Sequence, residues 1–298
     1  RDMRRHTLKA ALLRPQFAAL AAVMFINWLL FPGFFTITWQ DGRLFGSLID
    51  VLNRGAPVAI LAVGVTAVIA TKGVDLSVGA VMAVAGAVAA TCAVAGQPLI
   101  VTLVAALAIG ILCGLWNGIL VAYLGIQPFV ATLVLMVAGR GVAQLITEGS
   151  IVTFSDPALI FVGTGNLFGL PMPAVIAIVL MITAHLFMRR TAIGLFIEAI
   201  GINLSAANYT GLRSKLVILC IYAFGGFCAA TAGIIAAAGG DNIPKEWIDQ
   251  LDTGGRLVAP VVTAGGQQSL VVIDKNKDGI EKSILENVLF VPLKPGII

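Results

Sequence analysis

The 298-residue chain is 59% hydrophobic and only 11% charged, with a mean hydropathy of +0.99 and a formal net charge of +4. This balance is typical of a polytopic membrane protein and excludes an ordinary soluble domain, whose surface needs many more solvating side chains. No basic stripe with interleaved aromatic residues occurs, so the sequence does not indicate a nucleic-acid-binding protein.

One long tract carries no formal charge. From Leu76 to Gly139, 64 residues include no Asp, Glu, Lys or Arg, and such a tract is expected to lie in lipid. Asp75 stands directly before it, three residues after Lys72. An unpaired carboxylate is costly in hydrocarbon, so we expect Asp75 to be a helix cap, a partner of Lys72 or a functional group.

Apolar windows long enough to span about 30 Å of hydrocarbon predict seven membrane helices. They cover residues 16–35, 51–71, 76–96, 98–124, 128–147, 171–188 and 216–238. The crowded region 76–124 fits either two helices or one broken helix. The fold class predicted is therefore all-α and polytopic, with about seven transmembrane helices, followed by a small α+β tail.

Basic residues predict the orientation. Five Lys and Arg residues lie within residues 1–14, and Arg189, Arg190, Arg213 and Lys215 flank the loop after the sixth window. Both clusters are expected on the cytoplasmic side, which places the N-terminus there and requires an even number of crossings between them. The loops at 36–50 and 148–170 then face the other side.

Two spans contain features that stand out. Gly110, Gly114 and Gly118 repeat every four residues and give one helix face a bare backbone, which favours close approach of another helix. Asn117 beside them must find a partner or line a wet path. Arg140 is either an interfacial residue reaching the lipid headgroups or, as we prefer from its position well inside a window, an inward-facing group that shapes a translocation path.

The loop at 191–211 is neither a plain linker nor a span. Glu198 and Ala199 followed by Gly201 predict a short helix that ends at the glycine. Apolar residues such as Phe196, Ile197 and Ile200 are expected to enter a groove on a partner. A short cytoplasmic helix of this kind suits force transfer from a motor subunit.

Four segments occur in order along the chain: Ala70–Gly79, Leu115–Tyr123, Gln127–Leu133 and Glu198–Gly211. Together they resemble the membrane permease of ribose-type monosaccharide importers of the ATP-binding-cassette (ABC) class. The segment Gln40–Gly46 and the following Asn53–Pro57 are most similar to the galactofuranose branch. The resemblance covers about residues 1–238, and Lys72 departs from it, because the family commonly has Gly at that position.

The resemblance implies a permease of the bacterial inner membrane with no catalytic residues, cofactor or metal. Its implied partners are a second permease subunit, cytoplasmic ATPase subunits, a periplasmic sugar-binding protein and a monosaccharide. We assign the translocation path to Asp75, Asn117 and Arg140. The helix that contacts the ATPase would include Glu198, Gly201, Asn203, Ala207 and Gly211.

The last part of the chain, residues 239–298, differs in composition and holds 14 of the 34 formal charges. Ile243–Val261 and Asn287–Leu293 resemble the C-terminal part of a protein-L-isoaspartate O-methyltransferase. A helix at 244–251 and two or three strands, at 257–262, 269–273 and beyond, are predicted. A glycine-rich cofactor loop is missing from these residues, so no methyltransferase activity is expected. We therefore interpret the chain as a chimera joined near Ala236–Asp241.

Two alternatives remain. An ion-gradient-driven secondary transporter would need acidic residues deep in several spans, and the sequence offers essentially only Asp75. The other alternative is a non-functional chimeric chain, since the resemblance ends before the family's final spans. A sugar permease subunit of an ABC importer is the function that the sequence predicts.

Overall fold

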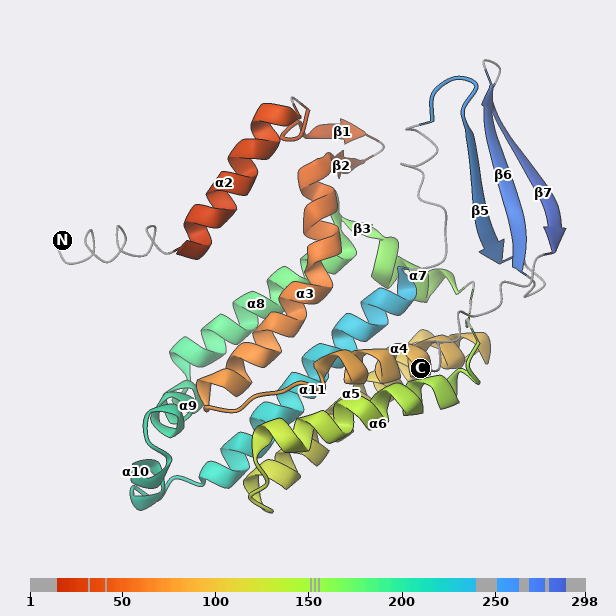
Figure 1. The fold of residues 1–298 in the computed structure, drawn as a ribbon. Helices are drawn as coiled ribbons and strands as arrows, with labels where there is room; N and C mark the ends of the chain where they lie inside the picture. The colour runs from red at the N-terminus through yellow and green to blue at the C-terminus, as the bar shows by residue number, and fades with distance from the viewer. Residues whose placement is uncertain are drawn as a thin grey trace, which may run out of the picture.

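The computed structural model describes residues 15–31, 33–40, 42–150, 152, 154, 156–239, 251–262, 268–276 and 279–287. These residues form a bundle of long helices with short hairpins at one end and a three-stranded sheet that stands apart (Figure 1).

One helix overlaps each predicted apolar window. The helices are α2 (Pro15–Leu30), α3 (Ser47–Ala70), α4 (Val78–Val94), α5 (Leu99–Ala122), α6 (Pro128–Ile146), α8 (Met172–Arg190) and α11 (Ser214–Ala238). Within the described residues, five of them, α3, α5, α6, α8 and α11, are long and apolar enough to cross a membrane. The polytopic class is confirmed, whereas the count of seven spans stays a prediction because α2 and α4 have only 16 and 17 residues.

The region 76–124 holds two helices, α4 and α5, joined at residues 95–98. Helix α4 is short because the chain between Gly73 and Ser77 is not helical. The apolar window is therefore divided into an irregular segment and a helix. We call residues 71–77 the connecting segment.

Helix α11 forms the centre of the bundle (Figure 1). In its most apolar window 61% of the residues are buried, against 17–22% in the other four long helices. Each of the three apolar clusters of the bundle includes buried residues of α11. These residues are Ile234 and Ala238 in the first cluster, Cys228, Ala232 and Ile235 in the second, and Ile221 and Tyr222 in the third. Since small residues make up much of α11, neighbouring helices approach it closely on several sides.

Two hairpins and a short helix lie at one end of the bundle. They are β1 (Thr38–Gln40) with β2 (Arg43–Phe45), α7 (Pro157–Thr164), and β3 (Asn166–Leu167) with β4 (Leu170–Pro171). The Leu44 amide donates to the Gly169 carbonyl at 2.9 Å, which joins the two loops that were predicted to share one side. Asp156 caps α7 by accepting from the Ala158 amide at 3.0 Å, and this helix was not predicted.

Two short helices, α9 (Ala192–Ile202) and α10 (Leu204–Tyr209), lie at the opposite end (Figure 1). They follow Arg189 and Arg190, the last two residues of α8. We call this part of the molecule the α9–α10 end.

The strands of the tail are β5 (Arg256–Val262), β6 (Gln268–Asn276) and β7 (Gly279–Asn287), which pair antiparallel in chain order. Arg256 donates to both carboxylate oxygens of Asp274, at 2.6 and 3.0 Å, and this hydrogen bonding lowers the pKa of Asp274. The predicted helix at 244–251 lies almost wholly outside the described residues.

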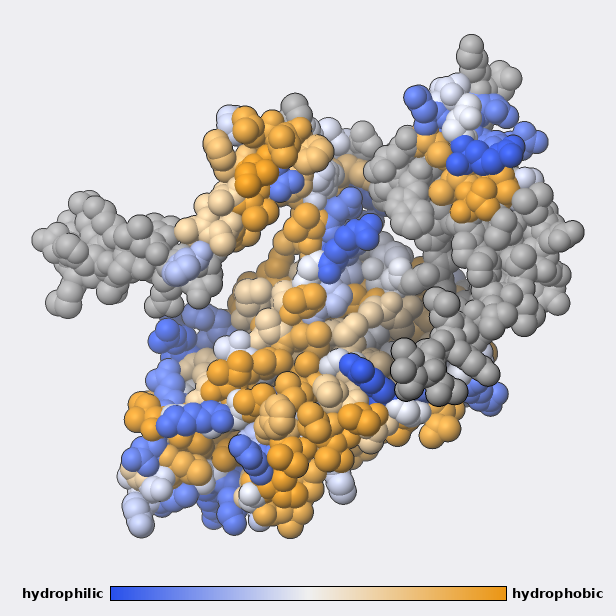
Figure 2. All heavy atoms as spheres, viewed as in Figure 1, coloured by the Kyte–Doolittle hydropathy of each residue, from blue (hydrophilic) through white to orange (hydrophobic). Residues whose placement is uncertain are grey.

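Apolar side chains cover most of the visible face of the helices, and hydrophilic residues gather at the α9–α10 end (Figure 2). Leu112, Trp116 and Leu145 are among the large apolar residues on this outer surface, at 58%, 55% and 78% exposure. Outward apolar faces on this scale fit a lipid surround rather than water.

Candidate functional site

Helix α3 ends in a Schellman motif, which closes the helix with two backbone hydrogen bonds from residues beyond it. The Lys72 amide donates to the Ile69 carbonyl at 2.9 Å, and the Gly73 amide donates to the Val68 carbonyl at 3.1 Å. Lys72 occupies the left-handed position of this motif, with φ of 62°. Glycine is usual there, because a side chain in this conformation costs about 1–2 kcal/mol.

Asp75 and Asn117 belong to one buried chain of hydrogen bonds. Oδ1 of Asp75 accepts from the Ser77 amide at 2.8 Å and from the Ser77 hydroxyl at 2.6 Å. The Ser77 Oγ in turn accepts from Nδ2 of Asn117 at 2.8 Å. Exposure of the three residues is 9%, 1% and 0%, so the network lies inside the protomer.

The network fixes the connecting segment against α5 just before α4 begins. Within the described part of the chain, Asp75 forms no ion pair with Lys72, and its contacts are those of a carboxylate that closes a turn ahead of a helix. Oδ1 of Asn117 is buried and has no hydrogen-bond partner among the described residues. A buried amide oxygen without a partner is uncommon in folded proteins and marks this position as unusual.

Two further hydroxyls approach the backbone of the same segment. Tyr222 of α11 donates to the Val74 carbonyl at 3.4 Å, and Thr132 of α6 lies at the same distance from that carbonyl while making its shorter bond, 2.9 Å, to the Pro128 carbonyl of its own helix. Non-helical backbone at membrane depth needs such partners, because lipid supplies none. Sequence reasoning missed Ser77, Thr132 and Tyr222; only Ser77, two residues after Asp75, carried a signal, since serine there can bond to the preceding aspartate.

The three glycines of α5 face α11. A Cβ atom on Gly110 would contact the Ala230 side chain, one on Gly114 would contact the Tyr222 carbonyl, and one on Gly118 would lie 3.0 Å from the Leu219 Cα. The two helix backbones are thus in direct contact along three turns. This contact holds Asn117, which follows Gly114 by three residues, in a fixed position.

Arg140 lies apart from this network, on the exposed surface of α6. It is the thirteenth of the helix's 19 residues, and Val137 one turn earlier is 64% exposed on the same side. The structure therefore does not bring Arg140 together with Asp75 and Asn117 in one protomer.

The residues assigned to ATPase contact are distributed over α9 and α10. Glu198 is exposed on α9, and Ala207 is buried within α10. Asn203 joins the two helices, and its side chain accepts from the Ala206 amide at 3.1 Å as the cap of α10. Gly211 follows α10 with φ of 85°, a conformation that suits glycine.

Two expectations for α9 were wrong. Ile197 and Ile200 do not project toward a partner, because they are 4% and 2% exposed and buried within this chain; Ile197 packs with Val68 and Tyr222. Gly201 does not end the helix, which continues to Ile202. Glycine is needed at 201 because a Cβ atom there would collide with the Ala70 carbonyl at the end of α3.

Large apolar side chains are nevertheless exposed on α9 and α10, among the hydrophilic residues of this end. Leu195, Ile202 and Tyr209 are 65%, 78% and 91% exposed at this end of the molecule. We call these three residues and Glu198 the docking face. It combines exposed apolar groups with one carboxylate beyond the ends of the long helices.

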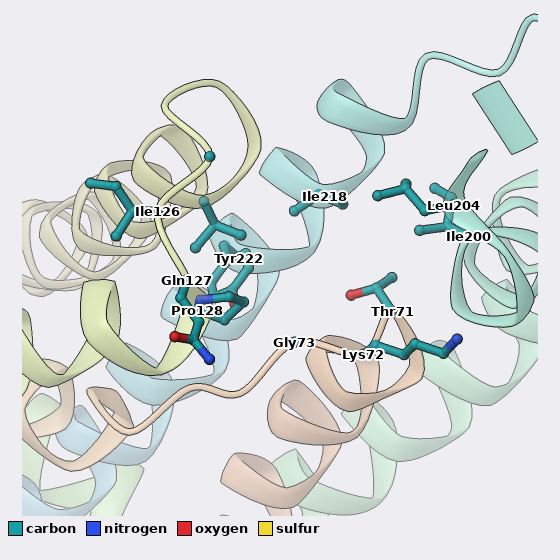
Figure 3. Close-up of a pocket in the computed structure, with 12 residues that line it drawn as sticks. Thr71, Lys72, Gly73, Ile126, Gln127, Pro128, Ile200, Leu204, Ile218 and Tyr222 are labelled. Atoms are coloured by element: carbon teal, nitrogen blue, oxygen red, sulfur yellow. The ribbon is translucent and has the colours of Figure 1, made fainter.

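A cavity of about 310 Å³ separates α9 and α10 from the loop between α5 and α6. Figure 3 shows Thr71 and Lys72 on the side of Ile200 and Leu204, with Gln127 and Pro128 across from them. The connecting segment, the two short helices and α11 all line this space. Ile200 of α9 and residues 71–73 of the connecting segment thus line one cavity.

A family model described as the permease component of a branched-chain amino acid transport system matches residues 47–273. No solved structure matches the chain.

Three similar proteins are import or transport permeases. The galactofuranose transporter permease of Escherichia coli K12 is 55% identical over 256 residues, which are 85% of this chain and 74% of that protein. The fructose import permease of Bifidobacterium longum is 43% identical, covering 69% of this chain and 59% of that protein. The ribose import permease of Escherichia coli K12 is 36% identical, and the match covers 79% of this chain and 72% of that protein. The chain therefore belongs to the family of permease components that this model describes, and it is a membrane permease subunit.

Proposed function

We propose that this chain is the membrane subunit of an ATP-driven importer that moves a monosaccharide across a bacterial inner membrane. The sugar class comes from the relatives, whose names specify galactofuranose, fructose and ribose. The 55% identity to the galactofuranose permease favours galactofuranose among them. The partners would be an ATP-binding-cassette ATPase, a second permease subunit and a periplasmic sugar-binding protein.

The main structural support is the docking face. Leu195, Ile202 and Tyr209 are exposed at one end of a membrane bundle, where basic residues of α8 lie nearby. Basic residues favour the cytoplasmic side, which is where an ATPase would meet the protein and where the N-terminus would also lie. Exposed aromatic and aliphatic groups around a charge suit a protein partner better than lipid headgroups.

The connecting segment supplies a wall for the sugar path in this proposal. The Tyr222 hydroxyl donates to its backbone at Val74 and the Asn117 amide donates to the Ser77 hydroxyl, so the segment is held in a non-helical shape within an apolar bundle. Irregular backbone of this kind is found in membranes where it is buried or lines a cavity. Asp75 and Asn117 would thus act on the path by shaping this wall.

Arg140 would face the path from α6. A guanidinium on an exposed helix surface within a span is costly against hydrocarbon. A second permease subunit against this face would provide the polar surround that lipid does not. The sugar would then pass between two subunits, with Arg140 available to donate to its hydroxyls.

We also propose that the sheet formed by β5, β6 and β7 is a unit separate from the permease part at residues 1–238. The sheet stands apart from the helices in Figure 1, and residues 239–298 hold 14 of the 34 charges. The family match continues to residue 273, across β5 and into β6, so expression of residues 1–238 alone is the test of this boundary. A membrane-inserted product with the thermal stability of the full chain would support it, and an aggregated product would contradict it.

The function is tested in proteoliposomes containing the chain, the ATPase and the binding protein encoded with it. Uptake of labelled galactofuranose, ribose and fructose is measured with ATP, with vanadate and with a protonophore. ATP-dependent uptake that vanadate blocks supports the proposal. Uptake that needs no ATP and collapses with the protonophore would indicate a gradient-driven transporter instead.

A further inference from the structure

Lys72 connects the end of α9 to the connecting segment. Its Nζ donates to the Ile202 carbonyl at 3.1 Å, across 130 positions of sequence. Ile202 is the last residue of α9, and the carbonyl groups of a final turn have no partner within their helix. A lysine ammonium at this point also complements the negative end of the helix dipole.

The same residue closes α3. The Lys72 amide bonds to Ile69, and the left-handed backbone at Lys72 turns the chain into the connecting segment. Lys72 therefore touches the ends of two helices, with its backbone on α3 and its side chain on α9. Glycine would make the same turn with less strain, but it would have no ammonium to offer.

The contact at Ile202 joins the docking face to the buried network. The Ile202 side chain is 78% exposed, whereas its carbonyl is bound by Lys72, three residues before Asp75. Gly201 lies directly against the Ala70 carbonyl, so α9 also abuts the end of α3. These two contacts join α9 to Ala70 and Lys72, where the connecting segment begins.

We propose that Lys72 is a positioning residue for transport, which transmits movement of the docking face to the connecting segment. This inference rests on the proposed function, because the movement would come from the ATPase. In this proposal Lys72 acts through its side chain on α9.

The test uses the complete importer in proteoliposomes and measures sugar transported per ATP hydrolysed. Lys72→Met keeps an unbranched side chain but removes the donor, and Lys72→Gly removes the donor and relieves the backbone. Both should lower the ratio about threefold or more while the ATPase stays bound. Lys72→Arg should keep most of the sugar transported per ATP hydrolysed, because the guanidinium can also donate to the Ile202 carbonyl. Lys215→Met is the matched control, because it removes a cation at the first turn of α11 that lies 5.8 Å from the Tyr123 ring centroid and not at the end of α9.

Thermal unfolding separates this role from a structural one. Lys72→Gly should unfold at the same or a higher temperature than the unaltered chain, because the left-handed strain is gone. A lower transport ratio in a protein that is no less stable supports the link. An unchanged ratio in both Lys72→Gly and Lys72→Met overturns it. Absence of ATP-dependent uptake by the unaltered chain would instead contradict the proposed function.

Discussion

Gly110 of α5 and Gly226 of α11 lie backbone against backbone. A Cβ atom on Gly110 would be 2.7 Å from the Gly226 carbonyl oxygen, and a Cβ atom on Gly226 would collide with the Gly110 carbonyl. Neither residue can carry a side chain without separating the helices. The contact places α5, and with it Asn117, against the central helix.

Gly226→Ala should therefore destabilise the protein by about 1–3 kcal/mol, the usual cost of overpacking. The strain arises because the new methyl group meets backbone, which cannot rotate away. Gly55→Ala is the control, since Gly55 lies within α3 and has no neighbour within 4 Å of an added Cβ. Thermal unfolding in detergent, read by tryptophan fluorescence, compares the variants. Equal melting temperatures for both would contradict the close contact.

The buried network predicts energetic coupling between Ser77 and Asn117. Ser77→Ala removes the group that accepts from Asn117 and donates to Asp75, which should cost about 1–3 kcal/mol. The double variant Ser77→Ala/Asn117→Ala should lose less unfolding free energy than the two single variants lose together, by about 0.5–3 kcal/mol. A double-mutant cycle of unfolding free energies measures this difference.

Thr183→Ala serves as the comparison for that cycle. Thr183 is exposed on α8 and donates only to the Val179 carbonyl of its own helix, at 2.7 Å. Its replacement should change stability little. Strictly additive losses at Ser77 and Asn117 would show that the two side chains act independently.

The sequence predicted where apolar helices lie but not where α4 begins. Hydropathy places a window at 76–96, yet the helix starts at Val78, because the turn at Lys72 and the bonds to Asp75 keep the preceding residues out of it. The side chains that approach this segment from elsewhere, Asn117, Thr132 and Tyr222, belong to α5, α6 and α11, which are distant in sequence. Periodicity within one segment cannot reveal them.

The direction of α9 could not be predicted for a similar reason. A helical pattern shows that Ile197 and Ile200 share a face, but the pattern is the same whether that face meets a partner or its own chain. The structure turns the face inward, onto Val68, Ile221 and Tyr222. The glycine repeat of α5 likewise indicates a close helix contact without naming α11.

The inward and outward sides of α9–α10 should respond differently to substitution. Tyr209→Ala and Leu195→Ala truncate exposed residues of the docking face, so we expect unchanged stability and ATPase binding weakened roughly tenfold. Ile200→Ala empties a buried site and should cost about 2–5 kcal/mol of stability. Titration with purified ATPase and thermal unfolding distinguish the two effects.

Glu198→Arg extends this comparison, because it reverses the one charge of the docking face while leaving the apolar residues in place. We expect loss of ATPase co-purification and of sugar-stimulated ATP hydrolysis. Retention of both by Glu198→Arg, together with unaltered binding by Tyr209→Ala, would show that the ATPase contacts another surface.

Substitutions at Arg140 test whether its surface of α6 faces the proposed sugar path or lipid. In a background without the four native cysteines, Arg140→Cys should react with a membrane-impermeant maleimide, because the proposed path is wet. Val179→Cys on α8, where Val179 is 58% exposed and apolar residues surround it, should stay unreactive. Arg140→Gln should lower sugar uptake with ATPase binding intact, since the guanidinium's charged donors are lost, and Arg140→Lys should retain part of the uptake. Equal labelling of the two cysteine variants and normal uptake by Arg140→Gln would place Arg140 at the lipid interface.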